Sequence, residues 1–195
     1  MASLQLAISF EQIKQVLKGH TPVHFALLDD LPHNPSDAHI FGQHDCAAIL
    51  CTLHSGGAAT NINHWIAIIK RKGEYWFFDS LGNDPVTLTA KLLIYRLAHN
   101  GHKALVNWMS SRKVVTTRVK LQKFQDNVQD CGAHVASRLV MKHLAPRKYV
   151  HWLQWKFYCK TWISRRYRPD CFDAMFLRFV QRLVMVSMAA EKYQF

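Results

Sequence analysis

The chain has 195 residues, 49% of them hydrophobic, and carries a formal net charge of +12. This length and apolar content suffice for one well-buried core, so we expect a single domain spanning residues 1–195, with a basic helical part at about 145–188. No run approaches the roughly 18 apolar residues of a membrane helix, and the first residues lack the pattern of a signal peptide, which argues against attachment to a membrane.

The five cysteines are an odd number at irregular spacings. This pattern differs from the paired cysteines of a secreted disulfide scaffold and favours a reducing, intracellular location, where a thiol stays free for chemistry. Cys46 follows His44 and Asp45 but runs directly into an apolar stretch, so we interpret it as a core or strand-edge residue. Together with Cys51 and His54 these residues lack the spacing of a common zinc site, and we expect no metal.

The first third of the chain is predicted to contain one helix and two strands. The apolar spacing of residues 10–17, followed by Gly19, predicts a short helix. Residues 25–28 and the longer apolar run 47–53 predict strands, and the second of these should be buried. Residues 29–39 contain two prolines and are predicted to form a loop.

A hairpin is predicted in the middle of the chain. Residues 63–69 are apolar and rich in β-branched side chains, and residues 75–79 are mainly aromatic, as is typical of strands. Residues 70–74 between them form a short polar link that contains a glycine, which favours a tight turn. The glycine-rich link at residues 55–60 is placed to line a cleft beside this hairpin.

The hairpin brings a histidine and a carboxylate together. If Lys70 pairs with Gly73, His64 lies directly opposite Asp79 on the neighbouring strand. If the register shifts by two residues, the two side chains become diagonal but stay on one face and within reach. In both registers Asp79 can hold one imidazole nitrogen of His64 while the other nitrogen faces a third group. Trp65 either shields this histidine from water or packs in the core on the opposite face.

The second half of the chain is predicted to be mainly helical, with a turn at 82–85 and one strand at 113–120. The predicted helices cover residues 86–99, 131–144, 148–164 and 171–188. Cys131 stands where the polar loop 124–130 meets the second of these helices. Because the first N–H groups of a helix lack intrahelical partners and its dipole favours negative charge, a thiol at this point ionises readily, and the thiolate is the nucleophile.

Two neighbours of Cys131 complete a candidate site. Gln125 offers an amide donor six residues upstream, and Gly132 removes a side chain beside the sulfur so that a substrate can approach. Asp130 is interpreted as the N-cap of the helix. The resulting set resembles the Ulp/SENP and adenain group of cysteine proteases, whose chain order is His, Asp (or Glu or Asn), Gln, Cys. The segments that carry the resemblance are His64-Trp65, Phe78-Asp79-Ser80-Leu81-Gly82, and Gln125 before Asp130-Cys131-Gly132.

The resemblance spans roughly residues 5–185 and implies an α+β, papain-like fold with a central mixed sheet flanked by helices and the nucleophile at a helix N-terminus. It implies that Cys131 attacks the substrate, that His64 is the general base and acid, and that Asp79 orients His64. Gln125 and the backbone N–H of Cys131 would form the oxyanion hole. The expected reaction is cleavage of proteins through an acyl-enzyme, without a small-molecule cofactor.

The chain resembles adenain, the adenovirus maturation protease, more than the larger SUMO proteases in its length, its short N-terminal region and its basic C-terminal third. This likeness implies virion precursor proteins as substrates, the host nucleus and the virion as locations, a monomer, and DNA and a peptide as activators. Adenain binds its peptide through a disulfide from a cysteine upstream of the nucleophile. Residues 108–128 contain no cysteine here, which argues against a covalent link to such a peptide.

The basic C-terminal third is the feature that favours DNA binding. Residues 131–169 contain nine Lys or Arg and no Asp or Glu, with aromatic residues interleaved. Such a surface binds polyanions with little sequence preference, although a solvated basic face over a core-facing aromatic stripe has the same pattern. The side chains that we expect to contact nucleic acid are Arg147, Lys148, Lys156, Lys160, Arg165, Arg166 and Arg168.

Three other functions remain open on the sequence. The order Asp79-Ser80-Leu81 is the SUMO-protease form, where adenain has Glu-Pro-Phe-Gly, and it favours removal of SUMO or ubiquitin from proteins. Related bacterial effectors use a similar triad for acetyl transfer. A basic packaging protein with an inactive protease core is the non-enzymatic alternative. The presence of all four polar site residues argues for the protease.

Overall fold

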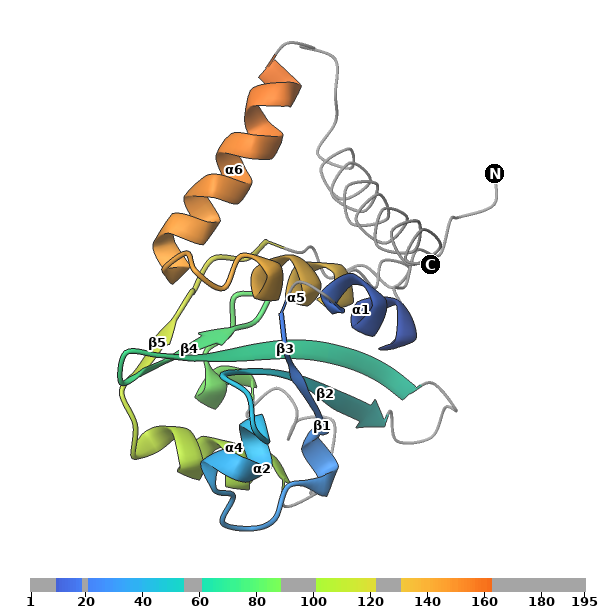
Figure 1. The fold of residues 1–195 in the computed structure, drawn as a ribbon, viewed down its shortest axis with the longest axis vertical. Helices are drawn as coiled ribbons and strands as arrows, with labels where there is room; N and C mark the ends of the chain where they lie inside the picture. Colours follow the sequence, from blue (N-terminus) through green and yellow to red (C-terminus); the bar gives the residue numbers. More distant parts are fainter. Residues whose placement is uncertain (1–9, 19–20, 55–60, 89–100, 122–130, 163–195) are drawn as a thin grey trace, which may run out of the picture.

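The computed structural model describes residues 10–18, 21–54, 61–88, 101–121 and 131–162. Within these residues the chain forms a five-stranded sheet with helices on both faces (Figure 1). The strands are β1 (His24–Leu27), β2 (Cys46–His54), β3 (Asn61–Arg71), β4 (Glu74–Phe78) and β5 (Val114–Thr116). They lie side by side in chain order. The two outer pairs are parallel and the two inner pairs antiparallel, so the sheet is mixed.

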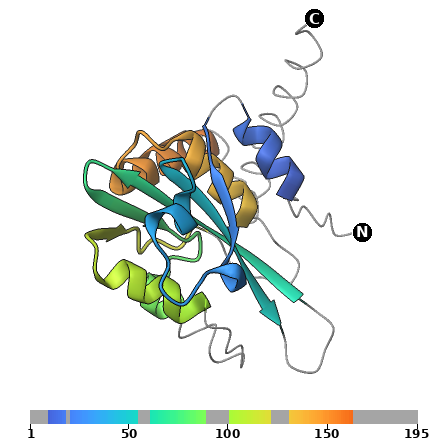
Figure 2. The same cartoon turned by 60° about the horizontal axis from the view of Figure 1, so that its bottom comes forward.

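The helices divide between the two faces of the sheet, as Figures 1 and 2 show. One face is covered by α1 (Phe10–Leu17) and α5 (Cys131–Val140). The other carries the single 3₁₀ turn η1 (Leu28–Asp30), α2 (Asp37–Phe41) and α4 (Gly101–Ser110). The last described helix, α6 (Pro146–Trp162), begins with a proline, which fits the first turn of a helix, and rises away from the sheet. The α+β class with a central mixed sheet flanked by helices is thereby confirmed.

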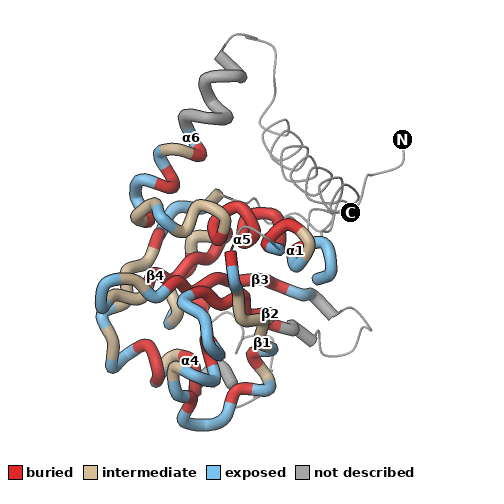
Figure 3. The backbone as a smooth tube through the Cα atoms, viewed as in Figure 1, coloured by how far each residue is buried: buried red, intermediate tan, exposed pale blue. Residues whose placement is uncertain are grey.

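Alternating side chains of the strands form two apolar layers. The layer under α1 and α5, here called the α5 layer, takes Trp65, Ala67 and Ile69 from β3. The opposite layer, here called the α4 layer, takes Ile66 and Ile68 from the same strand. Figure 3 shows burial concentrated in the central strands and in α5. Every residue of α5 from Cys131 to Leu139 is buried, so this helix is packed against other parts of the protein on nearly all sides.

The β3–β4 hairpin is the most informative local structure. Its turn consists of Lys72 and Gly73, with φ of 50° and 78°, as a two-residue turn between twisted strands requires. Arg71 therefore pairs with Glu74, which places the register two residues away from a Lys70–Gly73 pairing. The second of the two predicted registers is the correct one.

Several predicted elements match the structure, and several differ. The N-terminal helix, the first strands and the hairpin are confirmed within one or two residues at most ends. The predicted loop 29–39 contains most of η1 and the start of α2. α2 begins there because Ser36 and His39 form a capping box around its first turn. The predicted strand 113–120 is reduced to β5, and α4 begins at the point where a helix was expected to end.

The helix that starts at Cys131 is shorter than predicted. It ends at Val140 instead of residue 144, and turns follow. Arg138 explains the ending, since its guanidinium donates hydrogen bonds to the carbonyl oxygens of Met141 and Leu144 at 3.0 and 3.1 Å. These bonds fold the chain back after the helix. The link 55–60, most of the helix 86–99, the loop 124–130 and the helix 171–188 lie outside the described residues.

Candidate active site

His64 and Asp79 form a buried pair at the end of the hairpin. The imidazole Nε2 lies 2.9 Å from Asp79 Oδ1, and both residues are at least 95% buried. β4 pairs with β3 only from Ala67 to Arg71, so His64 lies beyond the last pair and Asp79 directly follows the strand. The diagonal arrangement that the two-residue register shift predicts is therefore what brings the two side chains together.

Both oxygens of the Asp79 carboxylate accept further hydrogen bonds. The backbone N–H of Leu81 donates to Oδ1 at 2.8 Å, and the Asn83 side-chain amide donates to Oδ2 at 2.6 Å. Asn83 is itself buried. Asn83 was not among the predicted site residues. The signal that could have found it is an amide residue in the turn that follows a candidate catalytic carboxylate, where an Asx-type turn forms readily.

The turn after Asp79 is packed against the chain that leads toward Gln125. Gly82 has a φ of 75°, and a Cβ added there would lie 2.8 Å from the backbone nitrogen of Lys120. A larger residue is therefore excluded by both conformation and space. The N–H of Leu121 also donates to the carbonyl oxygen of Ser80 at 2.8 Å. The segment that contains Lys120 and Leu121 is thus held beside the Asp79 carboxylate.

Cys131 reaches His64 from the start of α5. Its Sγ–H donates to the carbonyl oxygen of Asn63, the residue before His64, at 3.8 Å, and the thiol lies close enough to the imidazole to help raise the pKa of His64. Because Nε2 of His64 faces Asp79, Nδ1 is the nitrogen that remains for the thiol. As predicted, the cysteine is the first residue of a helix, where free N–H groups and the helix dipole favour a negative charge.

The electrostatics of the pair favour a charged imidazole. Burial by itself would lower the pKa of His64, but hydrogen bonds to Asp79 and Cys131 outweigh it and raise the pKa from 6.5 to about 10. For Asp79, burial would raise the pKa, and the hydrogen bond from His64 more than offsets this, so that the pKa is lowered. At neutral pH the site therefore holds an imidazolium beside a carboxylate.

The other predicted site residues are placed as follows. Gln125 lies outside the described residues, so its part in an oxyanion hole remains a prediction. Arg147 and Lys148 are exposed on the first turn of α6. Lys156 and Lys160 belong to α6, and Arg165, Arg166 and Arg168 lie beyond the described residues.

The basic surface is smaller than the sequence indicates. Arg138, one of its nine cations, is 1% exposed and packs against the rings of Trp76 and Tyr149, 5.6 and 5.0 Å from their centroids. It is a core residue and cannot contact a polyanion. Tyr149 is also fully buried, which confirms the core-facing interpretation for this member of the aromatic stripe.

Two further cysteines are buried and differ from Cys131 in their surroundings. Cys46 belongs to the α5 layer, as expected of a core residue, and Cys51 belongs to the α4 layer directly opposite His64. Burial raises the pKa of both thiols, so neither is a ready nucleophile. Among the described residues no group of three His, Cys, Asp or Glu could hold a metal ion.

Trp65 lies on the opposite face of β3 from His64. It packs in the α5 layer against the rings of Phe10 and Phe25, with centroid distances of 5.9 and 6.3 Å. Of the two alternatives for this residue, packing in the core on the opposite face is confirmed. No helix among the described residues is long and apolar enough to span a bilayer.

No family model matches the chain, and no characterised protein matches it in sequence. Two solved structures are similar in shape: the crystal structure of the ASFV pS273R protease and that of its Se-Met form, each 13% identical, with TM-scores of 0.42 and 0.40. They cover 90% and 91% of this chain, which spans 67% and 66% of theirs, or about two thirds of their length. We draw no functional inference from a likeness at this level.

Proposed function

We propose that this protein is a cysteine endopeptidase that cleaves proteins through an acyl-enzyme on Cys131. One observation supports the proposal above all: the imidazole of His64 is hydrogen-bonded to the Asp79 carboxylate, and the Cys131 thiol lies beside it, 3.8 Å from the carbonyl oxygen of the neighbouring Asn63. A nucleophile, a base within hydrogen-bond reach and a third group that orients the base are the components of nucleophilic catalysis. Three separate elements, β3, the turn after β4 and α5, supply these groups.

In the proposed reaction the thiol proton already resides on His64 as the imidazolium, and the sulfur of Cys131 attacks the carbonyl carbon of the scissile bond as the thiolate. The developing oxyanion is stabilised by the N–H of Cys131 and by the Gln125 amide. The imidazolium then gives its proton to the leaving amine, and the thioester remains on Cys131. A water molecule that loses its proton to His64 hydrolyses the thioester and releases the Cys131 thiolate beside the imidazolium, while Asp79 stays ionised and holds the ring in place.

For the biological role we propose a viral maturation protease that processes virion precursors with DNA as a cofactor. The support is the adenain-like order of His64, Asp79, Gln125 and Cys131, together with the net charge of +12. The exposed Arg147 and Lys148 lie in a stretch without any acidic residue, and binding there would weaken steeply with salt. We retain an activating peptide, the host nucleus and the virion as parts of this proposal.

A second candidate is the removal of SUMO or ubiquitin from proteins. The observation that favours it is the aspartate in the order Asp79-Ser80-Leu81, whose backbone takes part in the site through the N–H of Leu81. This function uses the same chemistry, so only the substrate separates the two candidates. Rapid hydrolysis of a SUMO or ubiquitin adduct, together with slow cleavage of short peptides, would favour it over the maturation role.

The test is cleavage of a glycine-containing peptide library by the wild type and by Cys131→Ala, each with and without DNA. The Cys46→Ala variant is the matched control, because it also removes a buried thiol but one remote from His64. We expect cleavage by the wild type and the control, stimulation by DNA that is lost at high salt, and none by Cys131→Ala. Residual cleavage by Cys131→Ala would overturn the proposal, and DNA binding without any cleavage would favour the packaging protein.

A further inference from the structure

A groove of about 620 Å³ lies between α1 and the segment that leads into β1, and we call it the α1 groove. One wall is formed by α1, with the buried Leu17 at its base and the exposed Lys14 and Lys18 above it. The other wall contains the half-buried Val23 and Phe25. The α1 groove therefore combines an apolar interior with a charged rim.

The charges that face the α1 groove are mainly positive. The N–H of Lys18 donates to the carbonyl oxygen of Lys14 at 2.8 Å, so the two lysines are one turn apart on the same face. Four residues of helix advance about 6 Å. His44, from the segment before β2, is exposed at the other rim and can donate an N–H. Among the described residues of the lining, Glu11 is the single carboxylate. This balance favours an acidic ligand over a basic one.

The apolar interior of the α1 groove favours a peptide over a nucleic acid. Phe25 is its single aromatic side chain among the described residues, and this ring is already in contact with Phe10 and Trp65, at 5.0 and 6.3 Å between centroids. The Lys14 ammonium lies 6.0 Å from the same ring. Bases of single-stranded nucleic acids bind by stacking on open aromatic faces, which Phe25 does not offer. An aliphatic or aromatic side chain of a peptide needs only apolar contact.

The spacing of the two lysines matches an extended peptide. In an extended chain, alternate side chains point the same way and are about 6.6 Å apart. Two carboxylates at alternate positions therefore face Lys14 and Lys18 together. The side chain between them points to the opposite wall, where Val23 and Phe25 provide an apolar surface.

The register of the sheet places the α1 groove away from the candidate active site. His24, the first residue of β1, pairs with Ala47, and Ala47 pairs with Ile68. His64 lies four residues from Ile68 along β3, which corresponds to about 14 Å. The α1 groove extends from this start of β1 in the direction that leads away from His64. It is thus separate from the region that holds the residues next to the cleaved bond.

We propose that the α1 groove binds an extended acidic segment of a protein substrate at a distance from the cleaved bond. Carboxylates of this segment pair with Lys14 and Lys18, and an apolar side chain between them packs on Val23 and Phe25. A second contact of this kind raises the local concentration of the scissile bond at Cys131. The role in substrate recruitment rests on the proposed endopeptidase function, whereas binding of the acidic segment requires no turnover.

The first test is binding of a fluorescent peptide that contains Glu-Leu-Glu to Cys131→Ala, at low ionic strength. We expect binding to be lost when both glutamates are replaced by glutamine, and when the leucine is replaced by serine. Adding Lys18→Glu to this protein should weaken binding about tenfold, because an attraction at the rim becomes a repulsion. Lys103→Glu, at an exposed position of α4 on the other face of the sheet, is the charge-matched control and should leave binding unchanged.

The second test is turnover of a tethered substrate. The same acidic peptide is joined to a glycine-containing cleavage sequence by a flexible linker of about 20 residues, which spans about 25 Å. Relative to the glutamine version, we expect KM to fall about tenfold while kcat stays the same. The gain should disappear in Lys18→Glu and persist in Lys103→Glu.

Equal weakening of binding by Lys18→Glu and Lys103→Glu, or binding that does not depend on the leucine, would overturn the proposal in favour of a general attraction between charges. Displacement of the peptide by DNA at this site would assign the α1 groove to nucleic acid, and a dimer that Lys18→Glu disrupts would assign it to a second copy. Each of these results also overturns the proposal. Selective binding without cleavage of any substrate supports the α1 groove and contradicts the endopeptidase function instead.

Discussion

Two side-chain carboxylates, those of Asp37 and Asp79, each accept three hydrogen bonds from described residues but have different roles. Asp37, at the start of α2, accepts from Lys70 and Tyr75 at 2.8 Å each and from Arg112 at 3.0 Å. Asp79 accepts from His64, Leu81 and Asn83 at 2.6 to 2.9 Å. The first ties α2 to the hairpin and to the end of α4, and the second lies in the candidate active site.

The different roles of Asp37 and Asp79 come from their hydrogen-bond partners and not from the carboxylates themselves. Burial would raise the pKa of Asp37, but its hydrogen bonds to Lys70, Tyr75 and Arg112 lower it to about 2. Two of these partners keep their charge at any ordinary pH, so the cluster can only stabilise the fold. The partner of Asp79 is a histidine that can gain and lose a proton and that also touches a thiol. A perturbed carboxylate therefore indicates a functional site only when its partner can titrate.

The largest expected effect is on catalysis at Asp79. Asp79→Asn keeps the shape of the side chain but removes the charge that holds the imidazolium, and we expect kcat to fall about 10²- to 10⁴-fold. Asp37→Asn should leave kcat within a factor of two, because its cluster contacts no group of the candidate site. Steady-state cleavage by the two variants measures the contrast. A similar fall in both would show that Asp79 acts through the fold alone.

For stability we expect the reverse: Asp37→Asn should affect the free energy of unfolding although it hardly affects kcat. Asp37→Asn should lower the free energy of unfolding by about 1–2 kcal/mol, since it weakens charge-assisted hydrogen bonds that are partly exposed and screened by solvent. Urea unfolding at neutral pH measures the change. The variant Lys70→Gln removes one partner from the same cluster and should give a smaller loss. An unchanged midpoint in Asp37→Asn would contradict a structural role for the cluster.

A smaller catalytic effect is expected at Asn83. Asn83→Ala removes the donor to Oδ2 of Asp79, so the pKa of that carboxyl should rise and the pKa of His64 should fall. We expect kcat to decrease about tenfold, the alkaline limb of the pH–rate profile to move to lower pH, and KM to stay the same. Asn83→Ser keeps a donor and should recover part of the loss. Reduced activity with an unmoved profile would assign Asn83 a purely structural role.

The last effect is the pH dependence of stability that the His64–Asp79 pair produces. The pKa of His64 is raised from 6.5 to about 10, so its stabilisation is complete below pH 6.5 and is lost as the pH rises toward 10. For Asp37 the stabilisation is present above pH 3.8 and is lost as the pH falls toward 2. The difference in unfolding free energy between the wild type and Asp79→Asn should therefore shrink between pH 6.5 and 10. A difference that stays constant over this range would contradict the His64 assignment.

Much of the candidate site follows from local sequence. The two strands of the hairpin, the meeting of His64 with Asp79 and the position of Cys131 at a helix start depend on side-chain alternation and on a helix boundary, which short windows of sequence determine. The choice between the two registers does not follow from local sequence, because it depends on whether the turn has two residues or more. The positive φ of Lys72 decides it, and a non-glycine residue with that φ is uncommon.

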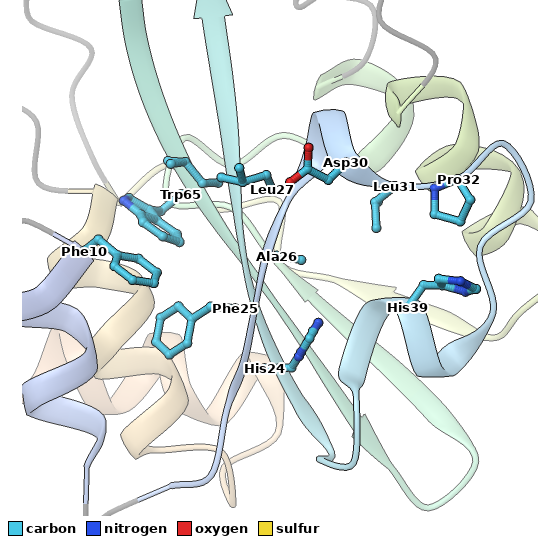
Figure 4. A pocket seen from close by; sticks show the side chains of 11 residues that line it. Phe10, His24, Phe25, Ala26, Leu27, Asp30, Leu31, Pro32, His39 and Trp65 are labelled. Carbon is cyan, nitrogen blue, oxygen red and sulfur yellow. The ribbon is translucent and has the colours of Figure 1, made fainter.

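The remainder depends on packing between distant segments. Arg138 counts as a surface cation in the sequence but is buried, because the carbonyl groups that follow α5 need donors and two aromatic rings are close by. Asn83 belongs to the site only because the turn after Asp79 folds back on its own carboxylate. A groove of about 520 Å³ beside β1 is lined by residues of α1, β1, η1, α2, β2 and β3, so no single stretch of the chain indicates it (Figure 4).

The most direct test of the account is detection of the acyl-enzyme. The wild type, Cys131→Ala and Cys51→Ala would each be mixed with an activated ester of a glycine-terminated peptide and quenched in acid, and their intact masses and modified residues measured. We predict one acyl group per molecule, on Cys131, in the wild type and in Cys51→Ala, and none in Cys131→Ala. An acyl group on another cysteine, or no adduct in a folded wild-type protein, would contradict the assignment of Cys131 as the nucleophile.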